Sequence, residues 1–546
     1  MNRDRWIVLT GIVVLLSFAI AWACLAGRLT LWSDELPPVQ AAKGLWLTGK
    51  PFLYDLDMGT IGDKPYTHGY PMSFLGQFVY RALGHPSLFW FRVIPLSFGL
   101  VTIVFFLLFL RFSGLVNRVK LWLLIALFFS CAIVFDNLLF YRYYTLIGLC
   151  ALLNLVAFWY GAAAIKARCW LKALMWALLF IAAFIYPLAG HLQIVHCVII
   201  PVAGIILAFG SSGRLREWIV CRRKILVFLA AGAVILWPLI VYVCDLGLAR
   251  VDVGGGAVSR TYMTIWDNLF GLARFGLALN IVILAAVWWV RDRQDKALNL
   301  ETFLCLTGVI SGLLIGFCNP HHMIFLARYY YVSAMLAVLG APAILLEMCR
   351  NGRKLGWLLG MFLVINFALI AVTMTLERDN IDRAVSWVEQ NLRPDDTLLC
   401  GLIEFEVHGG TNLVGRAHRV EASEDIRSVS RLRAFLEGQP STRVLLIYVD
   451  AYHPRDTLYH WTTGESRDPV SSLDVFMRIK AVGKDAAYGL RNCGVREFDR
   501  LALIDQLRTL EKTGFEAHFK GLEKRWAKRI FQHLKLWIQG RFNGAQ

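Results

Sequence analysis

The sequence predicts a polytopic α-helical membrane protein that carries a C-terminal α/β soluble domain. The chain has 546 residues, of which 57% are hydrophobic and only 17% charged, and its mean hydropathy is +0.55. Apolar runs long enough to cross a bilayer recur as far as residue 376, where the composition turns polar. A soluble protein of this size is not expected to have such a composition.

A transmembrane helix needs about 20 predominantly apolar residues. The first such run is long and lacks the cleavage site of a signal peptide, so we expect it to be retained. The sequence then predicts about eleven spans, near residues 6–26, 88–110, 119–136, 143–163, 170–187, 194–210, 224–243, 273–290, 302–318, 330–348 and 356–376. The predicted domains are a transmembrane domain (1–376), with a first outer loop at 27–88, and a soluble domain (377–546) that mixes helical and strand-like patterns.

Positive charge follows the predicted topology. The formal net charge is +17, but Lys and Arg gather in alternate short segments, near residues 3–5, 111–120, 166–172, 214–224, 291–296 and 350–354. Cytoplasmic loops have this bias, so anionic lipid is a simpler partner than nucleic acid. The N-terminus is therefore predicted to be cytoplasmic and the C-terminal domain exported. The outer face holds the longer segments and is the predicted working face.

Two adjacent carboxylates, Asp34 and Glu35, follow the first span by a few residues. Pro37 and Pro38 cannot continue a helix from upstream but can begin one. Both carboxylates would then lie at the positive end of a short helix. From these residues alone, a helix-capping role and a catalytic role are equally compatible with the pattern.

Two further polar clusters lie in predicted outer segments. In the first loop, Asp63-Lys64-Pro65-Tyr66-Thr67-His68 places a lysine beside acids, which suits a phosphate group but is also typical of a solvated loop. Asp136 and Arg142 bracket a turn that continues into Tyr143 and Tyr144. Ionisable groups at membrane depth usually face a polar cavity or a partner, and these two can also pair with each other.

Arginines also occur at the predicted outer ends of two spans. Arg328, next to Tyr329, is suited to clamp an anion. Arg92 lies just inside the second span, where it can either extend to the interface or reach a site. In the polar C-terminal region only Cys400 and Cys493 occur, and they can form one disulfide if that region is exported.

Taken together, these motifs resemble the GT-C class of integral-membrane glycosyltransferases. The nearest branch holds protein O-mannosyltransferases and the aminoarabinose transferases that modify lipid A. The likeness covers roughly residues 1–375 and rests on short motifs in a fixed order, namely Ser33-Asp34-Glu35, Asp63-Lys64-Pro65, Arg92-Val93-Ile94-Pro95 and Arg328-Tyr329.

The resemblance implies transfer of a sugar from a polyprenyl-phosphate donor to a lipid, glycan or protein hydroxyl, with inversion at the anomeric carbon. Nucleotide sugars are cytoplasmic, so an enzyme working on the outer face needs a donor already carried across the bilayer. Asp34 is the expected general base, with Glu35 also in the catalytic group. The expected phosphate ligands are Lys64, Arg142, Arg328 and Arg92, and the expected substrate contacts are Asp63, Tyr66, His68, Asp136, Tyr143 and Tyr329.

The resemblance leaves the use of a metal open, because members of this class differ in it, and Glu35 or Asp63 can help to hold a divalent cation. The expected location is the bacterial cytoplasmic membrane. Two other functions stay open. A secondary transporter would have inverted repeats and interrupted helices, and a non-catalytic scaffold would use the exported domain to bind partners.

Overall fold

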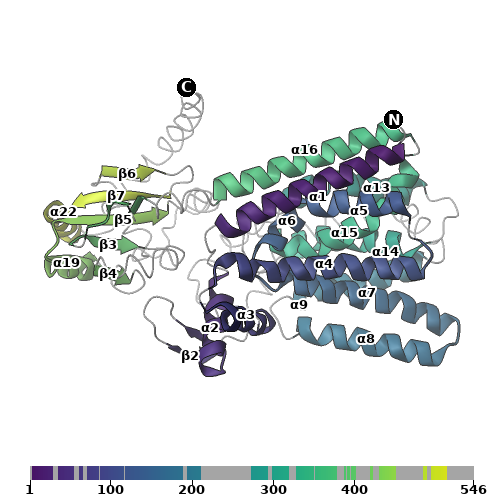
Figure 1. Cartoon of the computed structure of the whole chain (residues 1–546), viewed down its shortest axis with the longest axis horizontal. Helices are drawn as coiled ribbons and strands as arrows, with labels where there is room; N and C mark the ends of the chain where they lie inside the picture. Colours follow the sequence, from purple (N-terminus) through teal and green to yellow (C-terminus); the bar gives the residue numbers. More distant parts are fainter. Residues whose placement is uncertain are drawn as a thin grey trace. The chain divides into compact units, whose positions relative to one another are not determined.

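The computed structural model describes residues 3–28, 35–54, 61–65, 70–84, 86–115, 117–188, 193–210, 272–292, 298–318, 327–349, 351–377, 387–388, 390–393, 395–400, 418–421, 429–449, 484–488 and 493–512. The chain forms two compact units, Met1–Thr375 and Leu376–Gln546. The first unit is a bundle of long helices, and the second contains a sheet (Figure 1).

The bundle helices coincide with most of the predicted spans. They are α1 (Arg3–Arg28), α4 (Leu88–Phe112), α5 (Arg118–Ser130), α6 (Ala132–Leu139), α7 (Tyr144–Lys166), α8 (Trp170–Leu188), α9 (Gln193–Gly210), the helix Leu272–Ala278, α13 (Asn280–Asp292), α14 (Leu300–Cys318), α15 (Ala327–Met348) and α16 (Gly352–Glu377). Among the described residues, five helices are long and apolar enough to cross a membrane, or seven if each bent pair is one span. The polytopic α-helical prediction is thus confirmed. The predicted span at 224–243 lies outside the described residues.

Two predicted spans are broken rather than continuous. The span predicted at 119–136 is divided into α5 and α6, which meet at 68°, and the span at 273–290 is divided into Leu272–Ala278 and α13, which meet at 83°. Cys131, between α5 and α6, has an extended backbone (φ −64°, ψ 117°), which ends the first helix. Hydropathy does not show these bends, because both halves of each pair are equally apolar.

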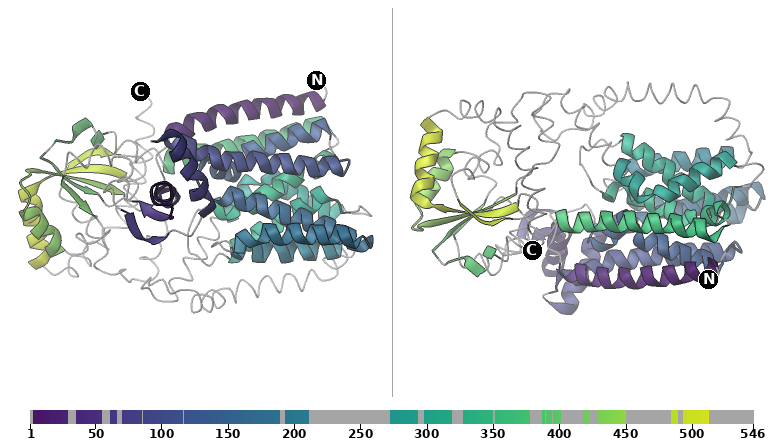
Figure 2. Two further views of the ribbon diagram at one scale, coloured as in Figure 1. Left: turned by 60° about the horizontal axis from the view of Figure 1, so that its bottom comes forward. Right: turned by 90° about the horizontal axis from the view of Figure 1, so that it is seen from above.

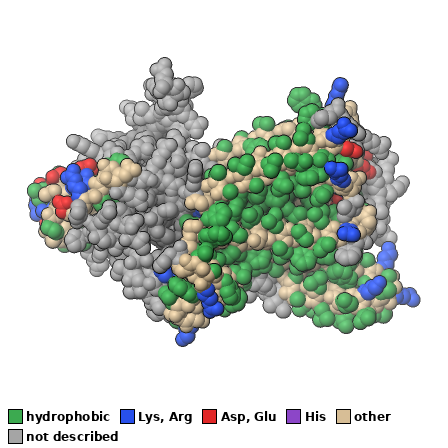
Figure 3. Space-filling model, viewed as in Figure 1, with side chains coloured by type: hydrophobic (Ala, Val, Ile, Leu, Met, Phe, Trp, Pro, Cys, Tyr) green, Lys and Arg blue, Asp and Glu red, His purple; other side chains and the backbone are tan. Residues whose placement is uncertain are grey.

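One flank of the bundle is hydrophobic and outward-facing (Figure 3). Trp357 of α16 and Leu171 of α8 are 83% and 74% exposed, and the exposed side chains of α1 and α4 are also largely apolar. Lysines and arginines line the end of the bundle near the N-terminus, and a second group lies near α2 at the other end (Figure 3). The spans run side by side in the further views of Figure 2, so this flank is the surface that lipid would cover.

Two short helices and a hairpin connect α1 to α4. They are α2 (Leu36–Thr48), β1 (Phe52–Tyr54), β2 (Ile61–Pro65) and α3 (Tyr70–Leu83), with β1 and β2 antiparallel. Prolines in the first turn of α2 fit its start, and Gly49, at φ 72°, ends it by donating its N–H to Leu45 O. Figure 1 shows α2 and α3 across one end of the bundle.

The second unit is an α/β fold, as predicted. Its sheet has the order β4-β3-β5-β7-β6, in which β4 (His418–Glu421), β3 (Thr397–Cys400) and β5 (Arg443–Val449) are parallel. The strands β7 (Cys493–Asp499) and β6 (Lys484–Tyr488) continue the sheet in antiparallel fashion. The helices α19 (Val429–Glu437) and α22 (Arg500–Lys512) contribute buried leucines, including Leu432, Leu436, Leu503 and Leu507.

The strand order argues against a disulfide between Cys400 and Cys493. Cys400 pairs with Ile447 of β5, and Cys493 pairs with Val449 of the same strand, so β5 separates the two cysteines. Neighbouring strands are about 4.7–4.9 Å apart, which puts the two Cα atoms beyond the roughly 7 Å that a disulfide allows. The suggested pairing is therefore wrong.

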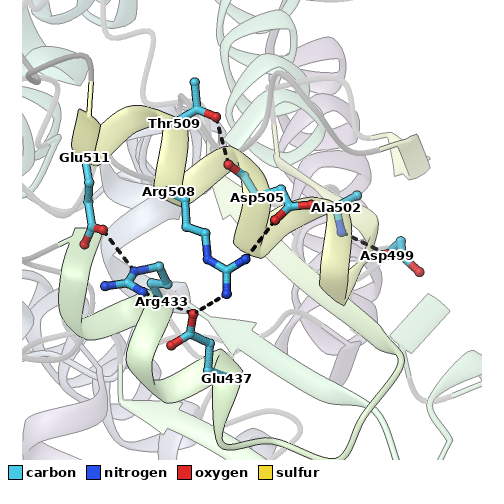
Figure 4. A network of polar contacts seen from close by, with 8 residues as sticks. All are labelled: Arg433, Glu437, Asp499, Ala502, Asp505, Arg508, Thr509 and Glu511. Carbon is cyan, nitrogen blue, oxygen red and sulfur yellow. Dashed lines mark hydrogen bonds and ion pairs between the residues drawn. The ribbon is translucent and has the colours of Figure 1, made fainter.

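An ion-pair network joins α19 to α22 (Figure 4). Arg508 lies 2.9 Å from Glu437 and 3.1 Å from Asp505, while Arg433 lies 3.1 Å from Glu437 and 3.0 Å from Glu511. The hydrogen bond from Arg508, together with the charge of Arg433, holds the pKa of the Glu437 carboxyl below its ordinary value. The ionised carboxylate therefore stabilises the contact between the two helices.

This shift predicts a small pH-dependent contribution to stability. Because the pKa of Glu437 is lower in the folded state, its contribution is complete above the unfolded pKa and is lost as pH falls through the folded pKa. Glu437→Gln should lower the thermal midpoint of the full chain slightly near neutral pH, since exposed pairs contribute little. The difference from wild type should vanish in acid and shrink in high salt. A difference that stays constant with pH would contradict this assignment.

Candidate active site

The carboxylate of Glu35 accepts three hydrogen bonds. Its oxygens lie 3.1 Å from Arg92 Nε and 2.7 Å from Arg92 Nη2, and one of them also accepts the backbone N–H of Tyr141 at 2.7 Å. Arg92 Nη1 donates to Ala26 O, 3.0 Å away in the last turn of α1. Both charged side chains have no exposed surface. This ion pair therefore connects four parts of the chain. They are the end of α1, the start of α4, the segment after α6 and Glu35, the residue just before α2.

Tyr141 extends the same cluster toward α3. Its hydroxyl donates to Met72 O of α3, and its ring lies 5.2 Å from the Phe91 ring. A Cβ at Gly76 of α3 would collide with the Tyr141 hydroxyl and with Ala42 of α2. The glycine thus permits the close packing that holds α2 and α3 against this end of the bundle.

A second buried ion pair lies on the two bent spans. Arg274 Nη2 is 2.6 Å from Asp136 Oδ2, and the two side chains are 13% and 5% exposed. Every residue of α6, which carries Asp136, is buried. Trp22 of α1 donates its ring N–H to Leu138 O at 3.0 Å, so α6 is held by α1 as well as by Arg274.

Arg274→Met removes the cation 2.6 Å from the buried Asp136 carboxylate, and breaking such a pair is expected to cost about 3–5 kcal/mol of stability. Arg274→Lys keeps the positive charge but not the planar guanidinium, so this variant should lose less stability. Thermal unfolding in detergent micelles compares both variants with wild type. Equal midpoints for all three proteins would show that the ion pair contributes nothing to the stability of the bend.

Three of the predicted site residues lie on one segment of the chain. Asp136 belongs to α6, and Arg142 and Tyr143 follow the end of that helix, all within eight residues. Arg142 is half-buried, with its guanidinium carbon 6.0 Å from the centre of the Tyr143 ring. Through Tyr141, the same segment contacts Glu35.

Other predicted residues are placed only by their backbones or not at all. Asp63 and Lys64 belong to β2, and Arg328 and Tyr329 belong to the first turn of α15. Asp34, Tyr66 and His68 lie outside the described residues. Their predicted roles stay predictions.

Glu35 does not fit the role of a metal ligand. Both of its oxygens face the Arg92 guanidinium, and a cation already compensates this carboxylate. Within the part of the chain that the structure describes, no three His, Cys, Asp or Glu side chains gather in a way that could hold a metal ion.

Arg274 was not predicted from the sequence to be a site residue. It stands at the start of an apolar run, where it was counted as part of a span. An arginine inside an apolar run is itself a signal, since such a charge usually has a partner or a polar cavity. The identity of that partner, 138 residues away, is not visible in the sequence.

Comparisons with known proteins gave structural matches only. The chain matches no protein-family model and no curated protein. It is similar to the crystal structure of ArnT from Cupriavidus metallidurans in the apo state, with 12% identity and a TM-score of 0.43 over 90% of this chain and 98% of that chain. It is also similar to the same protein bound to undecaprenyl phosphate, with 12% identity and a TM-score of 0.47 over 91% of this chain and 98% of that chain. A likeness at this level does not carry function from one protein to the other.

Proposed function

We propose that this chain is a membrane glycosyltransferase that moves a sugar from a polyprenyl-phosphate donor to an acceptor hydroxyl on the outer face of the bacterial cytoplasmic membrane. The observation that supports it best is the buried Glu35–Arg92 pair. It fixes the residue next to Asp34 at the bundle end that also carries Asp136 and Arg142. A long apolar bundle beneath such a cluster suits a substrate with a lipid tail and a charged head.

In the proposed reaction, Asp34 takes the proton from the acceptor hydroxyl as its oxygen attacks the anomeric carbon. The bond between that carbon and the phosphate oxygen breaks, and the electron pair leaves with the polyprenyl phosphate. Inversion at the anomeric carbon follows from direct displacement. Arg142, Lys64 and Arg328 would stabilise the departing phosphate electrostatically.

Glu35 and Arg92 act as positioning residues in this proposal. Their charged groups are directed at each other and at backbone groups, so their contribution is to hold the acidic stretch in place. The substrate contacts are proposed to come from Asp63, Tyr66, His68, Asp136, Tyr143 and Tyr329. The first outer loop (27–88) would supply the general base, Asp34, and the C-terminal domain would be exported and assist in recognising the acceptor.

A second candidate function is secondary transport, and one observation favours it. Transporters build their sites from interrupted helices, and two spans of this chain are bent at a break. However, the acidic side chains of the two described pairs, Glu35 and Asp136, each bind an arginine of the chain, whereas a transporter would use such a charge to bind a coupling ion. We rank transport second, and a non-catalytic scaffold third.

Mass spectrometry of the envelope tests the proposed function. Glycolipids and glycoproteins are compared between cells lacking the protein and cells in which the wild-type chain is restored. The proposal expects a species one sugar heavier to appear only in the restored cells, together with release of polyprenyl phosphate by purified protein in proteoliposomes. Identical envelopes in both strains, and no release of polyprenyl phosphate, would exclude it and favour transport.

A further inference from the structure

Asn366 is an unusual residue for its helix. Around it, α16 presents apolar side chains outward, with Trp357 and Val364 83% and 70% exposed. Asn366 itself has no exposed surface. A polar side chain in a membrane span is costly and needs a reason for being there.

The amide of Asn366 is bound to the backbone at both helix breaks. Its Oδ1 accepts the N–H of Ala132 at 2.8 Å, and its Nδ2 donates to Ala278 O at 3.0 Å and to Phe362 O of its own helix at 3.0 Å. Ala132 is the first residue of α6, after the first break, and Ala278 is the last residue before the second break.

These two backbone groups need a partner because the helices are broken there. The first N–H groups and the last C=O groups of a helix have no partner within it. Each would cost several kcal/mol if left unsatisfied in a bilayer. A primary amide offers both an acceptor and donors, so a single Asn366 satisfies a donor from one broken span and an acceptor from the other.

The ion pair of the candidate active site lies one helical turn away from this amide. Asp136 is four residues after Ala132 in α6, and Arg274 is four residues before Ala278. Residues four apart lie on the same face of a helix, about 6 Å apart along its axis. The same two segments are therefore linked twice, once by Asn366 and once by the Asp136–Arg274 pair.

We propose that Asn366 is a positioning residue that locks the two bent spans to each other and thereby sets the Asp136–Arg274 pair in its place. The structural part of this proposal stands on its own. Its catalytic meaning rests on the proposed function, because Asp136 has a role in sugar transfer only if the chain is a transferase.

The chemistry of the side chain gives two informative substitutions. Asn366→Leu removes all three hydrogen bonds of the amide, including the two that join the bent spans. Asn366→Asp gives a side chain of the same shape whose protonated form can still accept from Ala132 and donate to Ala278 O. Once ionised, the carboxylate has no donor for Ala278 O and repels it. The Asp variant should therefore behave like wild type in acid and approach the Leu variant as pH rises.

Asn154 provides a matched control. It is also fully buried in a span, α7, but among the described residues neither atom of its amide has a hydrogen-bond partner. Asn154→Leu makes the same chemical change without breaking a hydrogen bond, so it should be close to neutral.

Amide hydrogen exchange of the full chain in lipid nanodiscs tests the proposal. Asn366→Leu should speed exchange in both α6 and Leu272–Ala278 by about tenfold or more, the change that about 1.4 kcal/mol produces. Asn154→Leu should leave both segments unchanged. Asn366→Asp should match wild type in acid and diverge from it with rising pH, after correction for the intrinsic pH dependence of exchange.

Unchanged exchange in α6 and in Leu272–Ala278 of the Asn366→Leu variant would overturn the proposal. Sugar transfer gives a separate readout. If the chain is a transferase, the losses caused by Asn366→Leu and Arg274→Met should be less than additive, because both act through the same pair. Additive losses would overturn the link to the ion pair. If wild type transfers no sugar, the proposed function fails, while the exchange data still decide whether Asn366 locks the two spans.

Discussion

Asp34→Asn is expected to lower the rate of sugar transfer by about 10²–10⁴-fold, the usual contribution of a general base. The amide has nearly the shape of the carboxylate but cannot take a proton from the acceptor hydroxyl. Because Asp34 adjoins Glu35, whose carboxylate is bound by Arg92 and by the Tyr141 amide, the substitution should not disturb the fold. The affinity for the lipid-linked donor should change little.

A matched control is available in the same loop. Asp57→Asn changes a carboxylate for which no role is assigned, and its transfer rate should equal that of wild type. The wild-type rate should also fall in acid as the base becomes protonated. The residual activity of Asp34→Asn should not show this fall. Normal transfer by a correctly folded Asp34→Asn protein would show that another group is the base.

The second large effect is expected on stability, at the Glu35–Arg92 pair. Removing one partner of a fully buried, hydrogen-bonded ion pair costs about 3–5 kcal/mol, because the other charge stays buried without compensation. Arg92→Met and Glu35→Gln should each lower the thermal midpoint strongly. The Arg92→Met variant should be the worse, since it leaves an ionised carboxylate and also loses the bond to Ala26 O.

A double-mutant cycle separates this explanation from a simple loss of packing. The double variant Glu35→Gln with Arg92→Met removes both charges of this pair and should be more stable than Arg92→Met alone. A matched polar change on the lipid-facing surface, Ser97→Ala, should have little effect. If the double variant is as unstable as the sum of the two single variants, the charges do not interact as the geometry implies.

The sequence predicted the helical bundle because the signal for a span is local. About 20 consecutive apolar residues are enough to indicate a membrane helix, and no knowledge of neighbours is needed. The strand-like patterns predicted in the C-terminal domain are likewise confirmed, since that domain contains strands such as β3 and β5.

The parts that could not be predicted depend on contacts between residues far apart in the chain. The break after α5 is stabilised by Asn366, which is 234 residues away from Ala132. Glu35 was considered as a helix cap, yet its side chain makes no capping hydrogen bond to α2. It binds Arg92 instead. Similarly, no local pattern shows that β5 lies between the strands of Cys400 and Cys493.

The two buried ion pairs also have an electrical consequence. A single charge that crosses the membrane field exchanges about 2.3 kcal/mol for every 100 mV. Glu35 with Arg92, and Asp136 with Arg274, each sum to zero charge over less than 3 Å. If either pair shifts as a unit, the transmembrane voltage does almost no net work on it. A movement of the Glu35–Arg92 pair or of the Asp136–Arg274 pair as a unit is thus not driven by the transmembrane voltage.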